Sequence, residues 1–180
     1  MTTYKFLARG AVGPLSGFRW PAPRPGTPGA WVQPEGPLEL CVNGCHVCRV
    51  TDLAHWLHDE LWELETEGEH VEGIDCLVVR RARLVRRIDA WHLGGSTGFA
   101  EACAQHATEL ANRAAPGSSV AARGFLEDAI LALRAGFIAV SGYASALAVA
   151  KLGASADEDA LYRRERAWQS AWIARRVIGA

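Results

Sequence analysis

The stretch Leu61-Trp-Glu-Leu-Glu-Thr66 decides the fold of the first half of this chain, because it is typical of a β-strand with glutamates at alternate positions. A second strand-like stretch, Arg83–Trp91, follows it and is rich in arginine. Antiparallel pairing of the two places three glutamates opposite three arginines on one surface. The residues concerned are Glu63, Glu65 and Glu67 on one strand and Arg81, Arg83 and Arg87 on the other. We therefore expect a hairpin whose charges neutralise one another.

Further strand-like runs lie around this pair, separated by glycine and proline. They are Tyr4–Leu7, Phe18–Trp20, Trp31–Gln33, Leu38–Cys41 and Cys76–Val79. The segment Pro21–Gly29 is rich in proline, which predicts an exposed loop. One short helix is expected, capped by Thr51 or Asp52 and ending near His58.

The pattern becomes helical after residue 93. Helices are predicted at Phe99–Arg113, Ala121–Ala135 and Phe137–Leu152, with a last one starting at Ser155 and a break at 114–119. The sequence thus predicts an α+β fold. We expect residues 1–92 to form a small antiparallel β domain with one short helix. Residues 93–180 are expected to form a four-helix region packed on it or beside it.

The last helix has an apolar face and several arginines. Its buried face is predicted to comprise Leu161, Trp168, Trp172 and Ile173. The side chains expected to be solvated are Arg163, Arg164, Arg166, Arg175 and Arg176.

The composition argues against several kinds of partner. Hydrophobic residues make up 49% of the chain and charged residues 22%, with a net charge of −1, so there is no global attraction for nucleic acid or an anionic membrane. The amino terminus lacks the apolar run of a secretory signal, and the apolar stretch 137–152 is too short to span a bilayer. We expect a cytoplasmic protein with neither a nucleic-acid nor a membrane partner. Its five cysteines are then thiols or metal ligands.

Three of these cysteines lie in Cys41-Val-Asn-Gly-Cys-His-Val-Cys48, and this cluster supports two interpretations. In the first, it is a zinc-binding module. The candidate ligands are Cys41, Cys45, Cys48 and His46, with His55 or His58 as alternatives. In the second, the cluster is structural: Asn43-Gly44 makes a turn, the cysteines are small buried residues, and His46 bonds to the backbone.

The same cluster carries a resemblance to a known family. Together with Tyr4-Lys-Phe, Gly17-Phe-Arg-Trp20 and the strand at 61–66, it resembles uncharacterised phage and actinobacterial domains over residues 4–92. Their signature is Cys-x-x-Gly-(Ile/Phe)-His-Ala-Cys. Cys45 departs from that pattern because it occupies the apolar position, which implies that Cys45 is buried. The segment Tyr162–Trp172 is similar to the last helix of putative bacterial immunity proteins.

Two other features suggest sites. A strand-borne histidine followed by a strand glutamate resembles the core of ADP-ribosyltransferases, with His46 as the first and Glu63 or Glu65 as the second. Seven tryptophans are present, and those of the β half would suit an aromatic-lined pocket. The candidate ligand-binding residues are therefore His46, Trp20, Trp56 and Trp62.

No complete catalytic set is evident in the sequence. The leading hypothesis is a cytoplasmic protein that binds a small molecule or a protein partner, as an interaction or immunity-like protein does. The alternatives are an enzyme with His46 as its catalytic residue in a cleft, acting by ADP-ribosyltransferase-like or thiol–histidine chemistry, and the zinc-binding module described above.

Overall fold

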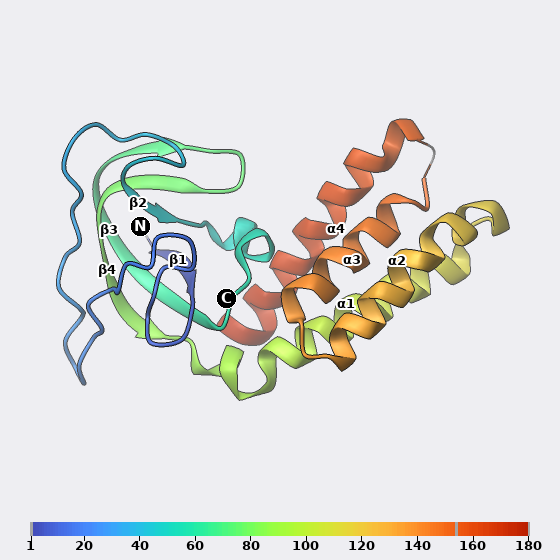
Figure 1. Cartoon of the computed structure of the whole chain (residues 1–180), viewed down its shortest axis with the longest axis horizontal. Helices are drawn as coiled ribbons and strands as arrows, with labels where there is room; N and C mark the ends of the chain where they lie inside the picture. Colours follow the sequence, from blue (N-terminus) through green and yellow to red (C-terminus); the bar gives the residue numbers. More distant parts are fainter. Residues whose placement is uncertain (1, 154, 180) are drawn as a thin grey trace. The chain divides into compact units, whose positions relative to one another are not determined.

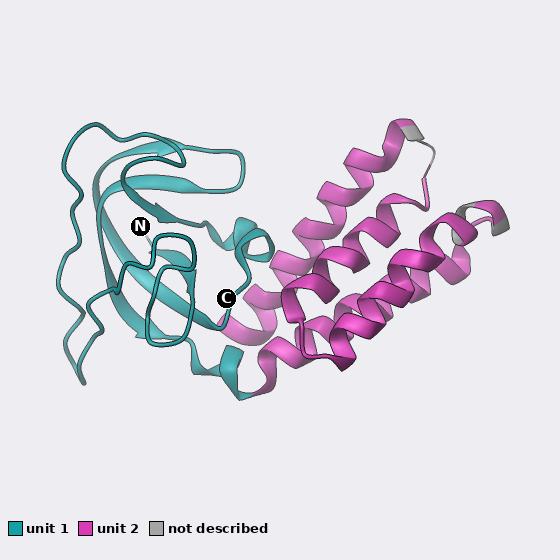
Figure 2. Cartoon of the chain, in the orientation of Figure 1, with its two compact units in different colours: residues 1–93 teal, residues 94–180 magenta. Residues whose placement is uncertain are grey.

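The computed structural model describes residues 2–153 and 155–179 of the 180-residue chain. The chain divides into two compact units, residues 1–93 and residues 94–180 (Figure 2). The first, here called the β unit, contains the sheet, and the second, the helical unit, contains the long helices. Sheet followed by helices confirms the predicted α+β class.

The described residues of the β unit form a curled four-stranded antiparallel sheet (Figure 1). Its strands are β1 (Thr2–Leu7), β2 (Cys45–Val47), β3 (Glu60–Glu72) and β4 (Leu77–Arg87), in the spatial order β1-β3-β4-β2. Two backbone hydrogen bonds between Tyr4 and Cys48, of 2.9 and 2.8 Å, join the residue after β2 to β1. The two edges of the sheet therefore meet, and the sheet encloses an interior.

The long β3–β4 hairpin carries the predicted ladder of opposite charges. Glu65 pairs with Arg83 at 2.6 Å, and Glu67 pairs with Arg81. Glu63, however, pairs at 2.6 Å with Arg86 rather than Arg87, because the register shifts between Glu63 and Leu64. Exposed pairs of this kind contribute only some tenths of a kcal/mol each. Their main effect is to balance the arginines of β4.

The opposite face of the hairpin forms the core of the β unit. Residues on a strand alternate between faces, so the neighbours of the charged positions point inward. The buried inward set includes Leu7, Trp62, Leu64, Val79, Ala82 and Leu84. A charged outer face and an apolar inner face fix the register of β3 against β4, since a one-residue slip would exchange them.

Several predicted boundaries in the β unit differ from the structure. The runs predicted at 76–79 and 83–91 belong largely to one strand, β4, and Trp91 begins a helical turn at Trp91–Gly95. The runs 18–20, 31–33 and 38–41 contribute only isolated bridges. The short helix is a 3₁₀ helix, η1 (Val50–Trp56), and Arg49 is its N-cap in place of Thr51 or Asp52. Asp52 instead accepts a hydrogen bond from the Arg49 backbone N–H.

The helical unit consists mainly of four α-helices. These are α1 (Ser96–Arg113), α2 (Pro116–Arg134), α3 (Ile138–Ala150) and α4 (Glu158–Ile173). The predicted break at 114–119 is confined to Ala114 and Ala115, because Pro116 occupies the first turn of α2, where its missing N–H costs nothing. Alanines such as Ala107, Ala122 and Ala148 fill the contacts of α1, α2 and α3.

The buried face of α4 is largely polar, which corrects the prediction for this helix. Arg166 was expected to be solvated, but it is buried and donates to Gln169 at 2.8 Å. Gln169 in turn donates to the Gly142 carbonyl of α3 at 2.9 Å. Glu165 is 2% exposed and meets Nδ1 of His106 on α1 at 3.1 Å. Polar bonds therefore hold α4 against α1 and α3.

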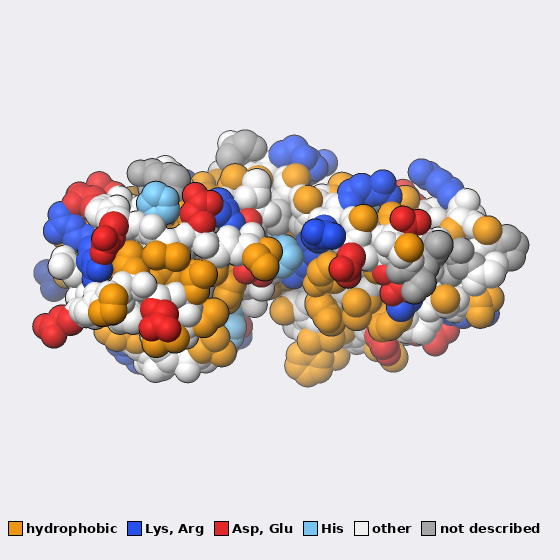
Figure 3. Space-filling model, turned by 90° about the horizontal axis from the view of Figure 1, so that it is seen from above, with side chains coloured by type: hydrophobic (Ala, Val, Ile, Leu, Met, Phe, Trp, Pro, Cys, Tyr) orange, Lys and Arg blue, Asp and Glu red, His pale blue; other side chains and the backbone are white. Residues whose placement is uncertain are grey.

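None of the helices that the structure describes has the length and apolarity to cross a membrane. Large hydrophobic side chains are nevertheless exposed on the helical unit, including Leu131, Phe137 and Val140. Figure 3 shows hydrophobic side chains among charged ones on this surface.

Candidate functional site

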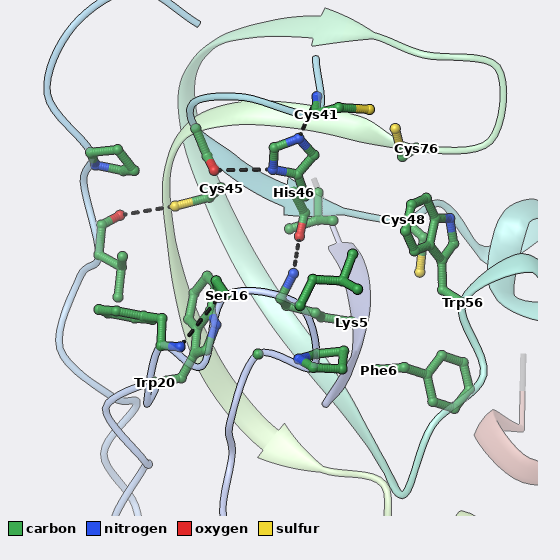
Figure 4. Close-up of a pocket in the computed structure, with 18 of the residues that line it drawn as sticks. Lys5, Phe6, Ser16, Trp20, Cys41, Cys45, His46, Cys48, Trp56 and Cys76 are labelled. Carbon is green, nitrogen blue, oxygen red and sulfur yellow. Dashed lines mark hydrogen bonds between the residues drawn. The ribbon is translucent and has the colours of Figure 1, made fainter. Parts of the chain in front are cut away.

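A cavity of about 620 Å³ opens in the β unit. Its wall comes from β1, β2, the loops around residues 13–20, 32–34 and 41–44, and the end of η1 (Figure 4). Most of the lining is apolar. The aromatic and aliphatic members are Phe6, Leu15, Phe18, Trp20, Val32, Val42, Val47 and Trp56.

The predicted cluster at 41–48 lies in this wall. Cys41, Cys45, His46 and Cys48 all line the cavity, together with Cys76 from the β3–β4 turn. The structure therefore gathers the cluster at one place, but its side chains do not converge on one point.

His46 uses both ring nitrogens to hold its own loop. Nε2 accepts a hydrogen bond from the Cys41 backbone N–H at 2.9 Å, and Nδ1 lies 3.2 Å from the Gly44 carbonyl oxygen. These partners assign the neutral tautomer with the proton on Nδ1. Burial, helped by the nearby charge of Lys5, lowers the pKa of His46. In this arrangement neither nitrogen faces a metal or a substrate, and His46 fixes the wall of the cavity.

The buried thiols are also bonded to the backbone. Cys45 donates to the Val32 carbonyl at 3.4 Å and Cys48 donates to the Tyr4 carbonyl at 3.3 Å. Burial raises the pKa of Cys45 to about 11 and that of Cys48 to about 12. Both are therefore protonated at neutral pH, whereas a metal ligand or nucleophile needs the thiolate.

The cluster does not form a metal centre in the described part of the chain. No group of three or more His, Cys, Asp or Glu side chains there is arranged to hold a metal ion. Of the alternative zinc ligands, His55 lies 3.6 Å from Asp75, and His58 accepts from the Asp59 backbone N–H. Neither lines the cavity.

The three candidate tryptophans separate into two groups. Trp20 and Trp56 line the cavity. Trp56 is oriented by a hydrogen bond of 2.6 Å from its indole N–H to the Asp75 carbonyl. Trp62 does not line the cavity: it lies in the core, 7% exposed, and donates to Glu60 at 3.0 Å.

The glutamates considered with His46 lie elsewhere. Glu63 and Glu65 are on the charged outer face of β3, paired with Arg86 and Arg83 at 2.6 Å. His46 bonds to Cys41 and Gly44 instead. Neither glutamate is therefore paired with His46, as the resemblance to ADP-ribosyltransferases would require.

Comparison with family models, characterised proteins and solved structures found no match to this chain. The function is therefore inferred from the residues that line the cavity.

Lys5 is a charged residue of the site that was not predicted from the sequence. It lies on β1 and lines the cavity, where its amine donates to the His46 carbonyl at 2.5 Å (Figure 4). Burial lowers the pKa of the Lys5 amine. One signal was present in the sequence: among 19 basic residues, only Lys5 and Lys151 are lysines.

The rim of the cavity is apolar as well. Leu15 is 94% exposed and Val42 is 70% exposed, although both are large hydrophobic side chains. Phe18 is also exposed and lies edge-on to Trp20, with ring centroids 5.9 Å apart. Apolar side chains therefore continue from the interior to the entrance.

Proposed function

We propose that this protein binds a small, mainly apolar molecule in the cavity of its β unit. The supporting observation is a cavity of about 620 Å³ whose lining is dominated by aromatic and aliphatic side chains. Ligand pockets commonly have volumes of roughly 300–1,000 Å³ and combine apolar walls with a few polar groups.

The exposed rim supports the same proposal. Leu15, Phe18 and Val42 hold apolar surface in water, which is unfavourable by roughly 25 cal/mol for each Å². A ligand that covers these side chains on entering the cavity removes that surface from water. The rim thus adds to the affinity for an apolar molecule.

The polar groups favour binding over catalysis. The Cys45 and Cys48 thiols are protonated, with pKa values raised to about 11 and about 12. Both ring nitrogens of His46 are hydrogen-bonded to the backbone, at Cys41 and Gly44. A thiol nucleophile would need a neighbouring base to activate it. The five unpaired cysteines suit a reducing compartment, and we place the protein in the cytoplasm.

Titration with Nile red, an uncharged apolar dye, tests the proposal. We expect saturable dye fluorescence with quenching of tryptophan emission, because Trp20 and Trp56 line the cavity. Trp20→Leu should weaken dye binding by about tenfold, which corresponds to losing roughly 1.4 kcal/mol of contact.

Trp31→Leu is the matched control. Trp31 belongs to the same unit but stacks on Arg81 and Arg83, with ring-to-guanidinium distances of 4.6 and 4.5 Å, outside the cavity. This variant should bind dye as the parent does. Equal dye binding by Trp20→Leu and the parent, with both folded by circular dichroism, would contradict the proposal.

A further inference from the structure

The charges of the cavity are unbalanced. Among the side chains that line it, Lys5 carries an amine and none carries a carboxylate, although the chain as a whole has 20 acidic residues. His46 is held as a neutral tautomer, and the thiols of Cys45 and Cys48 stay protonated at neutral pH. A cationic group in the cavity is therefore not neutralised by the wall around it.

Lys5 is held in place, but its hydrogen-bonding capacity is not filled. Its amine donates to the His46 carbonyl at 2.5 Å and lies 5.5 Å from the Trp20 ring centroid. Within the described part of the chain, no carboxylate pairs with it. An ammonium has three donors, so further N–H groups remain for a ligand.

The choice of lysine matters because 17 of the 19 basic residues are arginines, the two lysines being Lys5 and Lys151. An arginine stays charged in any environment, whereas a buried lysine can release its proton. Burial lowers the pKa of Lys5, so its amine releases a proton more readily than an exposed lysine does. An anion beside the amine would reverse that shift and restore the ammonium.

We propose that Lys5 is the anchor for a carboxylate, so that the ligand of this cavity is an amphipathic organic acid with an apolar body. The inference rests on the proposed binding function and names the ligand class. Aromatic and aliphatic walls take the body, while Lys5 pairs with the acid group. A charged amine pairs with the carboxylate directly, whereas an amine that has lost its proton takes up one proton on binding; in either case the product is a carboxylate–ammonium pair, and no covalent bond forms between ligand and protein.

Competition against Nile red tests this assignment with a matched pair of ligands, decanoate and decanol. Decanoate should displace the dye at about a tenfold lower concentration than decanol, because only the carboxylate can form a charge-assisted hydrogen bond with Lys5; a tenfold preference corresponds to about 1.4 kcal/mol. In Lys5→Met, decanoate and decanol should displace the dye at about equal concentrations. The concentration of decanol that displaces half of the dye reports whether the cavity persists in this variant. Lys5→Arg should retain the preference.

Lys151→Met is the control. Lys151 is the only other lysine of the sequence, and it pairs with Glu158 at 2.6 Å in the helical unit. Its replacement should leave the acid-to-alcohol ratio at the parent value. If Lys5→Met does not fold, calorimetry of the parent in two buffers of different ionisation enthalpy replaces it. Over a series of increasingly alkaline pH values, decanoate binding should come to take up protons, whereas decanol binding should not.

The outcomes separate this inference from the proposed function. Dye binding with equal displacement by decanoate and decanol would overturn the carboxylate anchor and leave the apolar cavity standing. A preference for the acid that survives in Lys5→Met would also overturn it. A third ligand, decanal, tests for imine formation with the Lys5 amine. If borohydride reduction links decanal covalently to Lys5 and decanoate does not compete with this labelling, the carboxylate anchor is overturned. Absence of dye binding in the parent would contradict the proposed function itself.

Discussion

At the scale of single residues, the surroundings of each cysteine determine its chemistry. Cys45 and Cys48 are buried and bonded to backbone carbonyls, and burial raises the pKa of both thiols, to about 11 and about 12. Burial also raises the pKa of Cys76 and of Cys103. Cys41 is exposed at the rim, in a left-handed backbone conformation with φ of +63°. The five thiols should therefore differ widely in reactivity.

Thiol titration of the native protein should show one rapid equivalent, from Cys41. The reactive form is the thiolate, which a solvent-exposed thiol supplies more readily than a buried one. The remaining four cysteines should react only after denaturation, because they are buried. Stopped-flow labelling with a chromogenic disulfide measures both phases, and Cys41→Ser should remove the rapid one. A rapid phase that persists in this variant would show that a buried thiol is accessible.

The sequence located the candidate site but did not identify its polar anchor. The cluster from Cys41 to Cys48 does line the cavity. Its histidine and thiols suggested metal or acid–base chemistry because sequence spacing cannot show that His46 bonds to the backbone of Cys41 and Gly44. Lys5 could not be found from spacing either, since the closure of the sheet brings it to His46 across 41 residues of chain.

At the scale of elements, the start of β3 organises a turn beside the cavity loops. Glu60 accepts hydrogen bonds from the backbone N–H groups of Gly10 and Ala11, at 3.1 and 3.0 Å. Both residues have positive φ, +78° and +58°, which turns their N–H groups toward the carboxylate. Burial alone would raise the pKa of Glu60, but these bonds, with one from Trp62, hold it below its ordinary value.

Glu60→Gln should therefore destabilise the β unit. A lowered pKa means that the carboxylate stabilises the fold above the ordinary glutamate pKa, and this contribution is lost as the pH falls through the folded-state value. The expected loss near neutral pH is about 1.5–3 kcal/mol, the range for hydrogen bonds to charged groups. Chemical denaturation followed by tryptophan fluorescence measures it, and the difference from the parent should shrink under acidic conditions.

The control for this prediction is Glu39→Gln. Glu39 is an exposed carboxylate of the same unit, so its replacement should change stability by less than about 0.5 kcal/mol. A Glu60→Gln variant as stable as Glu39→Gln at neutral pH would refute the anchoring role.

Element boundaries were predictable where charge and apolar patterns agreed. The β3–β4 pairing followed from glutamates facing arginines. The joining of residues 77–79 and 83–87 into one strand, β4, did not follow, because Arg80 and Arg81 interrupt the apolar run. In the structure Arg80 pairs with Glu69 and Arg81 pairs with Glu67, so the interruption belongs to the same ladder. The strand is continuous because these arginines pair with glutamates of β3, which the sequence of β4 alone does not show.

At the scale of the whole molecule, the interiors of the two units are stabilised by different kinds of interaction. The β unit has an apolar interior and places its charges on the outer face. The helical unit buries Glu165, Arg166 and Gln169 instead. Helical periodicity predicts that buried faces are apolar, so it assigned Arg166 to the solvent and missed this network. Polar burial of this kind makes stability depend on pH in a way that can be tested separately from the β unit.

Glu165→Gln should stabilise the helical unit at alkaline pH. Burial raises the pKa of Glu165, even though His106 attracts its charge, so the parent loses stability as the pH rises through that value. The amide stays neutral and can still accept from His106, and the gain should be on the order of 1 kcal/mol and vanish in acid. Thermal unfolding followed by far-ultraviolet circular dichroism measures it, with exposed Glu101→Gln on α1 as the neutral control. A variant less stable than the parent at alkaline pH would mean that the hydrogen bonds to the Glu165 carboxylate outweigh the cost of burying its charge. In that case Glu165 would stabilise the helical unit as the pH rises, as Glu60 stabilises the β unit. We expect the opposite: rising pH should lower the stability that depends on Glu165 and raise the stability that depends on Glu60.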